Sequence, residues 1–135
     1  MSTSPAFAAA LLFSAATCGS PTGPREVPPG QEFDLAPGES ARVEGGPQVT
    51  FQAVASESRC PIDVACVWAG DAVVELSLSR PGSTPATVEL HTARALGDSA
   101  SYDGFTVKLA RLLPYPRSAG DSPARDYRAT LLVSR

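Results

Sequence analysis

The segment SRCPIDVACVWAG, residues 58–70, places two cysteines and the only tryptophan of the chain within nine residues. Cys60 and Cys66 could serve as a redox dithiol or as a structural staple. Redox modules use the spacing C-x-x-C at the N-terminus of a helix, where the helix dipole lowers the thiolate pKa. Here five residues separate the cysteines and no helical period surrounds them. We therefore predict a structural disulfide, with a binding surface built around the closed loop as the other candidate role.

A disulfide between these cysteines requires the residues between them to fold back. A fully extended chain would separate the two Cα atoms by about 20 Å, whereas a disulfide needs about 5.5 Å. Pro61 fixes φ at the first position of the loop and favours a turn. Closing a loop of seven residues stabilises the fold by about 2.4 kcal/mol in the chain-entropy model.

The residues beside the cysteines suggest how the loop is held. Trp68 follows Cys66 by two residues, so on a strand the two share a face, and we expect the indole to pack on the bridge. Gly70 allows a bend into a strand from Asp71, and we expect Arg59 to pair with Asp63 or Asp71. The residues of the possible binding loop are Arg59, Pro61, Asp63 and Trp68.

Other groups that could do chemistry lack partners in the sequence. His91 is the only histidine, and by strand alternation it lies exposed on a polar face beside Glu89. One imidazole does not make a blue-copper site, and zinc would consume the two cysteines as thiolates. No nucleophile elbow is present, and carboxylates in loops are expected to be solvated (Asp98, Asp103, Asp121 and Asp126). We predict no catalytic residue, no metal site and no cofactor.

The N-terminal segment is typical of export. Residues 1–17 carry an apolar stretch from Ala6 to Ala16, which is too short to span a membrane and has the length of a signal-peptide core. Small residues then precede Cys18, a pattern that resembles the lipobox of bacterial lipoproteins and makes Cys18 the expected lipidation site. Residues 18–30 are rich in Pro and Gly, as in an extended tether. An ordinary secretory signal, giving a secreted or periplasmic protein, is the alternative.

From residue 31 to residue 135 we expect one domain made of strands. Alternating apolar residues indicate inward faces along the chain, at 33 and 35, at 41 and 43, at 49 to 53 with a slip at Val54 that is typical of a bulge, at 74 to 78, at 88 and 90, at 105 to 109, and at 127 to 133. Phe105 belongs to the expected core, whereas Tyr102 and Tyr115 are expected to cover loop edges with their hydroxyls in water. Seven or eight such strands predict an all-β, antiparallel two-sheet sandwich of the immunoglobulin-like kind, with a small β-barrel as the alternative.

The cysteine segment also carries a family resemblance. Residues 59–61 and 66–70 resemble the SRCP…CVWAG segment of small exported bacterial proteins of uncharacterised activity, many of them lipoproteins. The similarity extends over most of residues 31–135 through PGES, VTF and YDGFTVKLARLLPYP. In that family an Asp usually precedes Ser-Arg-Cys, and here Glu57 keeps the acidic character. The resemblance implies an exported location and a similar fold, and it implies no activity.

Composition limits the partners. With 135 residues, 43% of them apolar, the chain suits one core, and its net charge of −3 leaves no basic stripe for nucleic acid. We expect a non-catalytic lipoprotein of the bacterial cell envelope, held on the membrane by its lipid anchor and acting as a binding or accessory module. The sequence does not identify its ligand, and an envelope protein is one candidate partner. An inhibitor of an envelope protease and a small hydrolytic enzyme are the alternatives.

Overall fold

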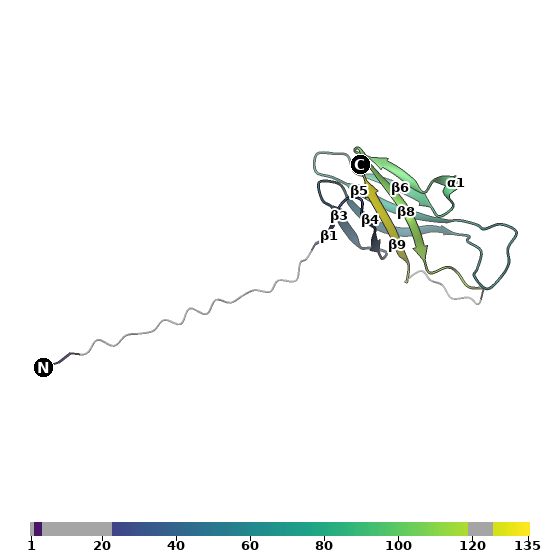
Figure 1. Ribbon diagram of the computed structural model, residues 1–135, viewed down its shortest axis with the longest axis horizontal. Coiled ribbons are helices and arrows are strands. Elements are labelled where there is room, and N and C mark those ends of the chain that lie inside the picture. Colours follow the sequence, from purple (N-terminus) through teal and green to yellow (C-terminus); the bar gives the residue numbers. More distant parts are fainter. Residues whose placement is uncertain (1, 4–22, 119–125) are drawn as a thin grey trace.

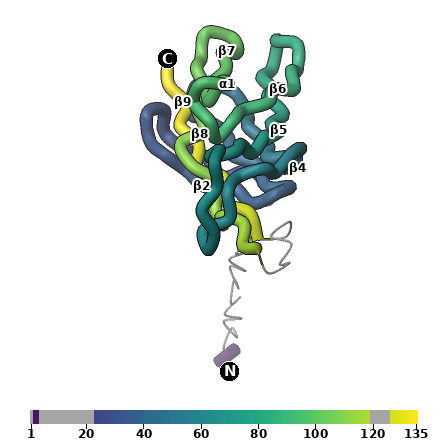
Figure 2. Tube along the Cα trace, turned by 90° about the vertical axis from the view of Figure 1, so that its right-hand side faces the viewer, coloured from purple at the N-terminus to yellow at the C-terminus, as the bar shows by residue number. Residues whose placement is uncertain are grey.

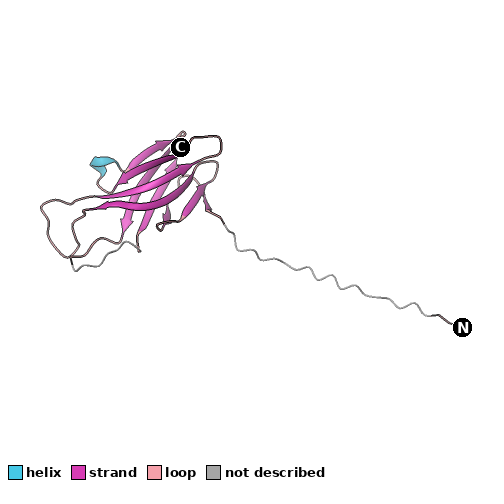
Figure 3. Ribbon diagram, turned by 180° about the vertical axis from the view of Figure 1, so that it is seen from behind, coloured by secondary structure: helices cyan, strands magenta, loops and turns pink. Residues whose placement is uncertain are grey.

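The structure is a computed structural model that describes residues 2–3, 23–118 and 126–135. The expected lipidation site Cys18 and the loop residue Asp121 lie outside the described residues. Two β-sheets face each other (Figures 1 and 3), and the four-residue helix α1 lies on a connection between them. Among the described residues, no helix has the length and apolar character needed to cross a membrane.

Within each sheet, nearly all neighbouring strands pair in antiparallel orientation. The first sheet has the order β1 (Arg25–Val27), β3 (Ser40–Val43), β4 (Gln48–Glu57), β5 (Ala72–Ser79) and β6 (Ala86–His91). The second sheet has the order β2 (Phe33–Leu35), β9 (Arg128–Ser134), β8 (Phe105–Leu113) and β7 (Ser99–Tyr102). The exception is β1, which pairs with β3 in parallel. Helix α1 (Arg94–Gly97) leads from β6 to β7 and so joins the sheets.

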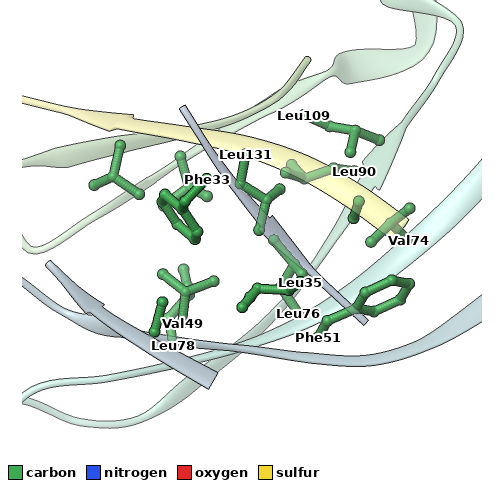
Figure 4. Close-up of a cluster of buried hydrophobic side chains, with 14 of the residues drawn as sticks. Phe33, Leu35, Val49, Phe51, Val74, Leu76, Leu78, Leu90, Leu109 and Leu131 are labelled. Carbon is green, nitrogen blue, oxygen red and sulfur yellow. The ribbon is translucent and has the colours of Figure 1, made fainter. Parts of the chain in front are cut away.

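This architecture confirms the predicted all-β sandwich, and the sheets do not close into a barrel. Alternation along each strand sends one set of side chains into the space between the sheets. Figure 4 shows this core with side chains from both layers, among them Phe51 and Leu76 from the first sheet and Leu131 from the second. Every expected inward position of β5, β8 and β9 is buried.

Two features differ from the sequence-based expectation. β1 lies within residues 18–30, which we expected to be tether, because Val27 buries its side chain against the core and the short strand pairs with β3. Tyr102 is buried, and its hydroxyl donates to the carbonyl of Thr84 at 2.9 Å, so its hydroxyl is not free in water.

The slip at Val54 marks irregular pairing. The register between β4 and β5 shifts between Phe51 and Ala53 and again between Val54 and Ser56. As a result Ala53, which alternation placed inward, is exposed. Beyond these shifts β4 and β5 continue into a long connection that projects past the end of the sandwich (Figure 1). Figure 2 shows this connection beside the chain that follows β8.

Candidate functional site: the stapled loop and its apolar tip

The connection between β4 and β5, residues 58–71, is here called the stapled loop. The predicted disulfide is present: Cys60 and Cys66 are bonded, with their Cα atoms 5.9 Å apart. Inside the ring, the Val64 N–H donates to the Pro61 carbonyl at 3.3 Å and closes a turn in which Pro61 is the first of four residues. The segment between the cysteines is therefore folded back on itself.

The base of the stapled loop is a short continuation of the β4–β5 ladder. The Ser58 N–H donates to the Asp71 carbonyl at 2.7 Å, and the Cys60 N–H donates to the Ala69 carbonyl at 2.9 Å. Gly70 lies between these bonds with a φ of +72°, and a Cβ built there would stand 1.8 Å from the Ser58 carbonyl oxygen. The bend expected at Gly70 is thus present, and only glycine fits it.

Arg59 anchors the loop to the sandwich. It is 6% exposed, and its Nε and Nη2 donate to the two carboxylate oxygens of Glu57 at 2.8 and 3.0 Å. Its remaining donors reach the carbonyls of Leu112 at 2.6 Å and Pro114 at 2.9 Å, and its guanidinium lies 4.6 Å from the centre of the Tyr115 ring. The expected pairing of Arg59 with Asp63 or Asp71 is wrong, because Glu57 is already aligned with the guanidinium two residues earlier on β4.

The Glu57 carboxylate has a second partner that sequence reasoning missed. The hydroxyl of Tyr127, the residue directly before β9, donates to Glu57 Oε2 at 3.0 Å. Burial, together with this bond to a carboxylate, raises the pKa of Tyr127 to about 12. The position of Glu57 directly before Ser-Arg-Cys was the one sequence signal that marked this residue. Its pairing with Tyr127 had no signal, because 70 residues of sequence separate the two.

A second segment braces the loop from the side. The Ile62 N–H donates to the Pro116 carbonyl at 3.1 Å, and the Ser118 N–H donates to Asp63 Oδ1 at 3.0 Å. The Ser118 hydroxyl also donates to Asp63 Oδ2, and the bonds from Ser118, the hydroxyl first, hold the pKa of Asp63 below its usual value. The stapled loop and residues 114–118 therefore form one composite end of the molecule.

This end of the molecule exposes several large apolar side chains. Val67 is 91% exposed and Trp68 is 81% exposed. We call the exposed set the apolar tip, and it consists of Ile62, Val64, Val67, Trp68 and Tyr115. The expected packing of Trp68 on the disulfide is wrong, because residues 58–71 leave the sandwich and Trp68 is not on a strand with a second layer above it.

His91 lies near the base of the loop and is not the exposed histidine that alternation suggested. It ends β6, is partly buried, and its Nδ1 lies 2.5 Å from Asp71 Oδ2. Asp71 Oδ1 accepts the Ala93 N–H at 2.9 Å and the Thr92 hydroxyl at 3.2 Å. Burial raises the pKa of Asp71, but these donors and His91 outweigh it, and the pKa falls below its usual value. The arrangement ties the loop base to the start of α1.

Asp103, another of the acids named above, has different partners. Asp103 lies in the β7–β8 turn, where it accepts hydrogen bonds from Arg80 at 2.9 Å and Ser83 at 3.0 Å. Within residues 23–118 and 126–135, no group of three or more His, Cys, Asp or Glu side chains is arranged to hold a metal ion. The described chain thus brings Asp71 to His91 and leaves Asp103 elsewhere.

An open groove of about 500 Å³ lies between β1 and β2 and was not predicted. Arg25 and Arg111 line it together with Glu26, Glu32 and Asp34, so charges of both signs are mixed along its walls. Arg25 is already bonded to the Asp34 carbonyl at 2.9 Å, and Thr130 donates to the Asp34 carboxylate at 2.5 Å. This mixed wall selects no class of ligand by charge.

Of the sequence-predicted site residues, the structure therefore brings Arg59, Pro61, Asp63 and Trp68 into one loop with different contacts from those expected. Comparison with known proteins found no matching family model, no similar curated protein and no similar solved structure.

Proposed function

We propose that this protein is a non-catalytic lipoprotein of the bacterial cell envelope that acts as a binding module through its apolar tip. The lipobox-like residues before Cys18 support the anchor, and the Cys60–Cys66 bridge suits an oxidising compartment. The observation that carries the proposal is the exposure of Val67 and Trp68 on a loop that a disulfide and a buried arginine hold in place.

Rigidity is what makes this loop a binding element. Exposed apolar groups on a mobile loop lose conformational entropy when they bind, whereas a preorganised loop has already lost it. The disulfide closes the ring, Gly70 fixes the crossing, and Arg59 bonds to Leu112 and Pro114 of the sandwich. Tryptophan is also among the residues most enriched at the centres of binding interfaces.

The alternatives receive less support. A hydrolytic site would gather carboxylates near His91, and there His91 pairs with Asp71 while Asp103 binds Arg80. A substrate-like inhibitor loop would present an extended segment to a protease, and the turn from Pro61 to Val64 folds that segment back. Both observations favour a binding role over these activities.

The proposal is tested by a photoreactive amino acid placed at position 67 in living cells, with position 96 as the matched control. Leu96 is also exposed and apolar, but it lies on α1. We expect discrete adducts from position 67, to a protein or to lipid, which disappear in the Cys60→Ser/Cys66→Ser background. Adducts from position 67 that match those from position 96 would contradict a binding role for the apolar tip. The intact mass of the membrane-extracted protein tests the anchor by acyl mass on Cys18.

A further inference from the structure

We infer that the apolar tip binds the bilayer itself, with Val67 and Trp68 inserted at the membrane interface next to the acyl chains on Cys18. This inference rests on the proposed function, since it requires the lipid anchor. It names the bilayer as the occupant of a surface that the proposed function leaves open to protein or lipid.

The chemistry of the tip fits a lipid–water boundary. Val67 is aliphatic, and the indole of Trp68 combines an apolar ring with one N–H, the combination that is enriched at membrane interfaces. Asp63 is the one ionisable side chain between Cys60 and Ala69. Its carboxylate is bonded to Ser118 on the bracing segment, and shallow insertion of Val67 and Trp68 leaves it at the level of the headgroups.

Three backbone amides of the loop also have partners that would persist at such a boundary. Unsatisfied peptide groups are costly where water is scarce. The amides of Cys60, Ile62 and Val64 donate to carbonyls within the protein, so these groups do not depend on water for partners.

The length of chain before the domain places the bilayer within reach. Because β1 begins at Arg25, seven residue steps separate it from Cys18, which span at most about 23 Å. A tether ending at residue 30 would have held the domain farther away. Any acyl group on Cys18 thus keeps the domain next to the membrane.

The direction of β1 brings this anchor toward the tip. β1 runs parallel to β3, and β3 runs antiparallel to β4, so the chain enters β1 from the side toward which β4 runs. Arg25 is level with Ala41 and, through it, with Val49. The end of β4 lies six β5 positions farther, from Leu78 to Ala72, or about 20 Å at strand spacing. Cys18 therefore reaches the level of the loop base, and a tilt of the domain brings anchor and tip to one plane.

Proximity favours the bilayer over a separate protein as the occupant. Because the domain begins seven residues after the membrane anchor, its tip meets that membrane as an intramolecular event, at the high effective concentration that a short linker gives. A protein partner would have to compete with it. Two membrane contacts, anchor and tip, would then fix the orientation of the sandwich on the surface.

The sole tryptophan makes the inference directly measurable. The full lipidated chain, purified from its membrane, is reconstituted into vesicles of phosphatidylethanolamine and phosphatidylglycerol, with and without brominated acyl chains. We expect brominated lipid to quench Trp68 and iodide to reach it poorly. Ile62→Ser/Val67→Ser keeps the tryptophan but should lose the quenching by bromine, whereas Leu96→Ser should retain it. Matching unfolding midpoints verify that both variants fold.

The outcomes separate the two proposals. Trp68 that stays open to iodide and unquenched by bromine, in a chain of verified acyl mass, overturns the bilayer contact. A change in Trp68 emission that requires added envelope protein overturns it too, and leaves the proposed binding function standing. A chain without acyl mass overturns both, because the reach from Cys18 then carries no argument.

Discussion

Arg59 and Glu57 form a two-point ion pair across a single intervening residue, with Nε and Nη2 of the guanidinium on separate oxygens of one carboxylate. The side chain of Arg59 is 4% exposed and that of Glu57 is 20% exposed. The pair lies where β4 leaves the sandwich. The position of the apolar tip therefore depends on this ion pair.

Replacing Arg59 with methionine should lower the free energy of unfolding by about 3 kcal/mol, because it leaves the largely buried carboxylate of Glu57 without its cation. The variant also leaves the carbonyls of Leu112 and Pro114 without their donor. Urea unfolding measures the loss. Arg128→Met is the matched control, since its ion pair with Glu39 is exposed on both sides and should change stability by less than about 0.5 kcal/mol. Equal effects in the two variants would refute the anchoring role.

The stapled loop shows which parts of the structure local sequence can predict. The disulfide and the bend at Gly70 follow from spacing and residue type within a dozen positions. The carbonyl partners of Arg59 do not, because Leu112 and Pro114 are more than 50 residues away and the brace from Ser118 to Asp63 joins segments equally distant. Such contacts depend on which strands become neighbours, and alternation reveals faces without giving strand order.

The exposure of Trp68 has the same origin. In a sequence, a tryptophan beside a disulfide matches the buried arrangement of immunoglobulin domains, and nothing local states that the chain has left the sandwich. The short strand β1 was also not predicted, because the local sequence carries too little information there. Three residues among prolines and glycines are too few to show a period, and Val27 is the one member whose burial marks them as part of the core.

Gly70→Ala should destabilise the protein by more than about 2 kcal/mol, because the methyl group meets the Ser58 carbonyl in addition to the strain of a positive φ. Gly82→Ala is a close control. Its φ of +82° is similar, but a Cβ there meets nothing within 4 Å, so about 1 kcal/mol of backbone strain is the expected cost. Urea unfolding of the two variants checks the difference. Equal losses would contradict the close crossing at the loop base.

Reduction of the Cys60–Cys66 bridge should lower the free energy of unfolding by about 2.4 kcal/mol, as the chain-entropy model gives for a seven-residue ring. Guanidinium unfolding with and without a phosphine reductant measures the change. The Cys60→Ser/Cys66→Ser variant should start from the reduced value and show no response to reductant. A response in that variant would mean that the reductant acts elsewhere, and an unchanged wild-type midpoint would mean that the sandwich holds the loop without the bridge.

The Glu57–Tyr127 contact predicts a specific loss of stability in alkali. Burial, and then the bond to Glu57, raises the pKa of Tyr127 to about 12 in the folded protein, above the value of about 10 for an unfolded tyrosine. A raised pKa means that the folded state holds the proton more tightly. The stability from this group is therefore fully present below about pH 10 and is lost as the pH rises toward 12.

Ultraviolet titration of tyrosinate, with Tyr127→Phe to assign the late step, measures the pKa of Tyr127. Glu57→Gln should lower it, because the carboxylate charge is gone while burial remains, and Glu39→Gln at an exposed site should leave it unchanged. Ionisation of Tyr127 near pH 10 in the wild-type protein would show that its hydroxyl does not bind Glu57. The Glu57 carboxylate would then not be held between Tyr127 and Arg59.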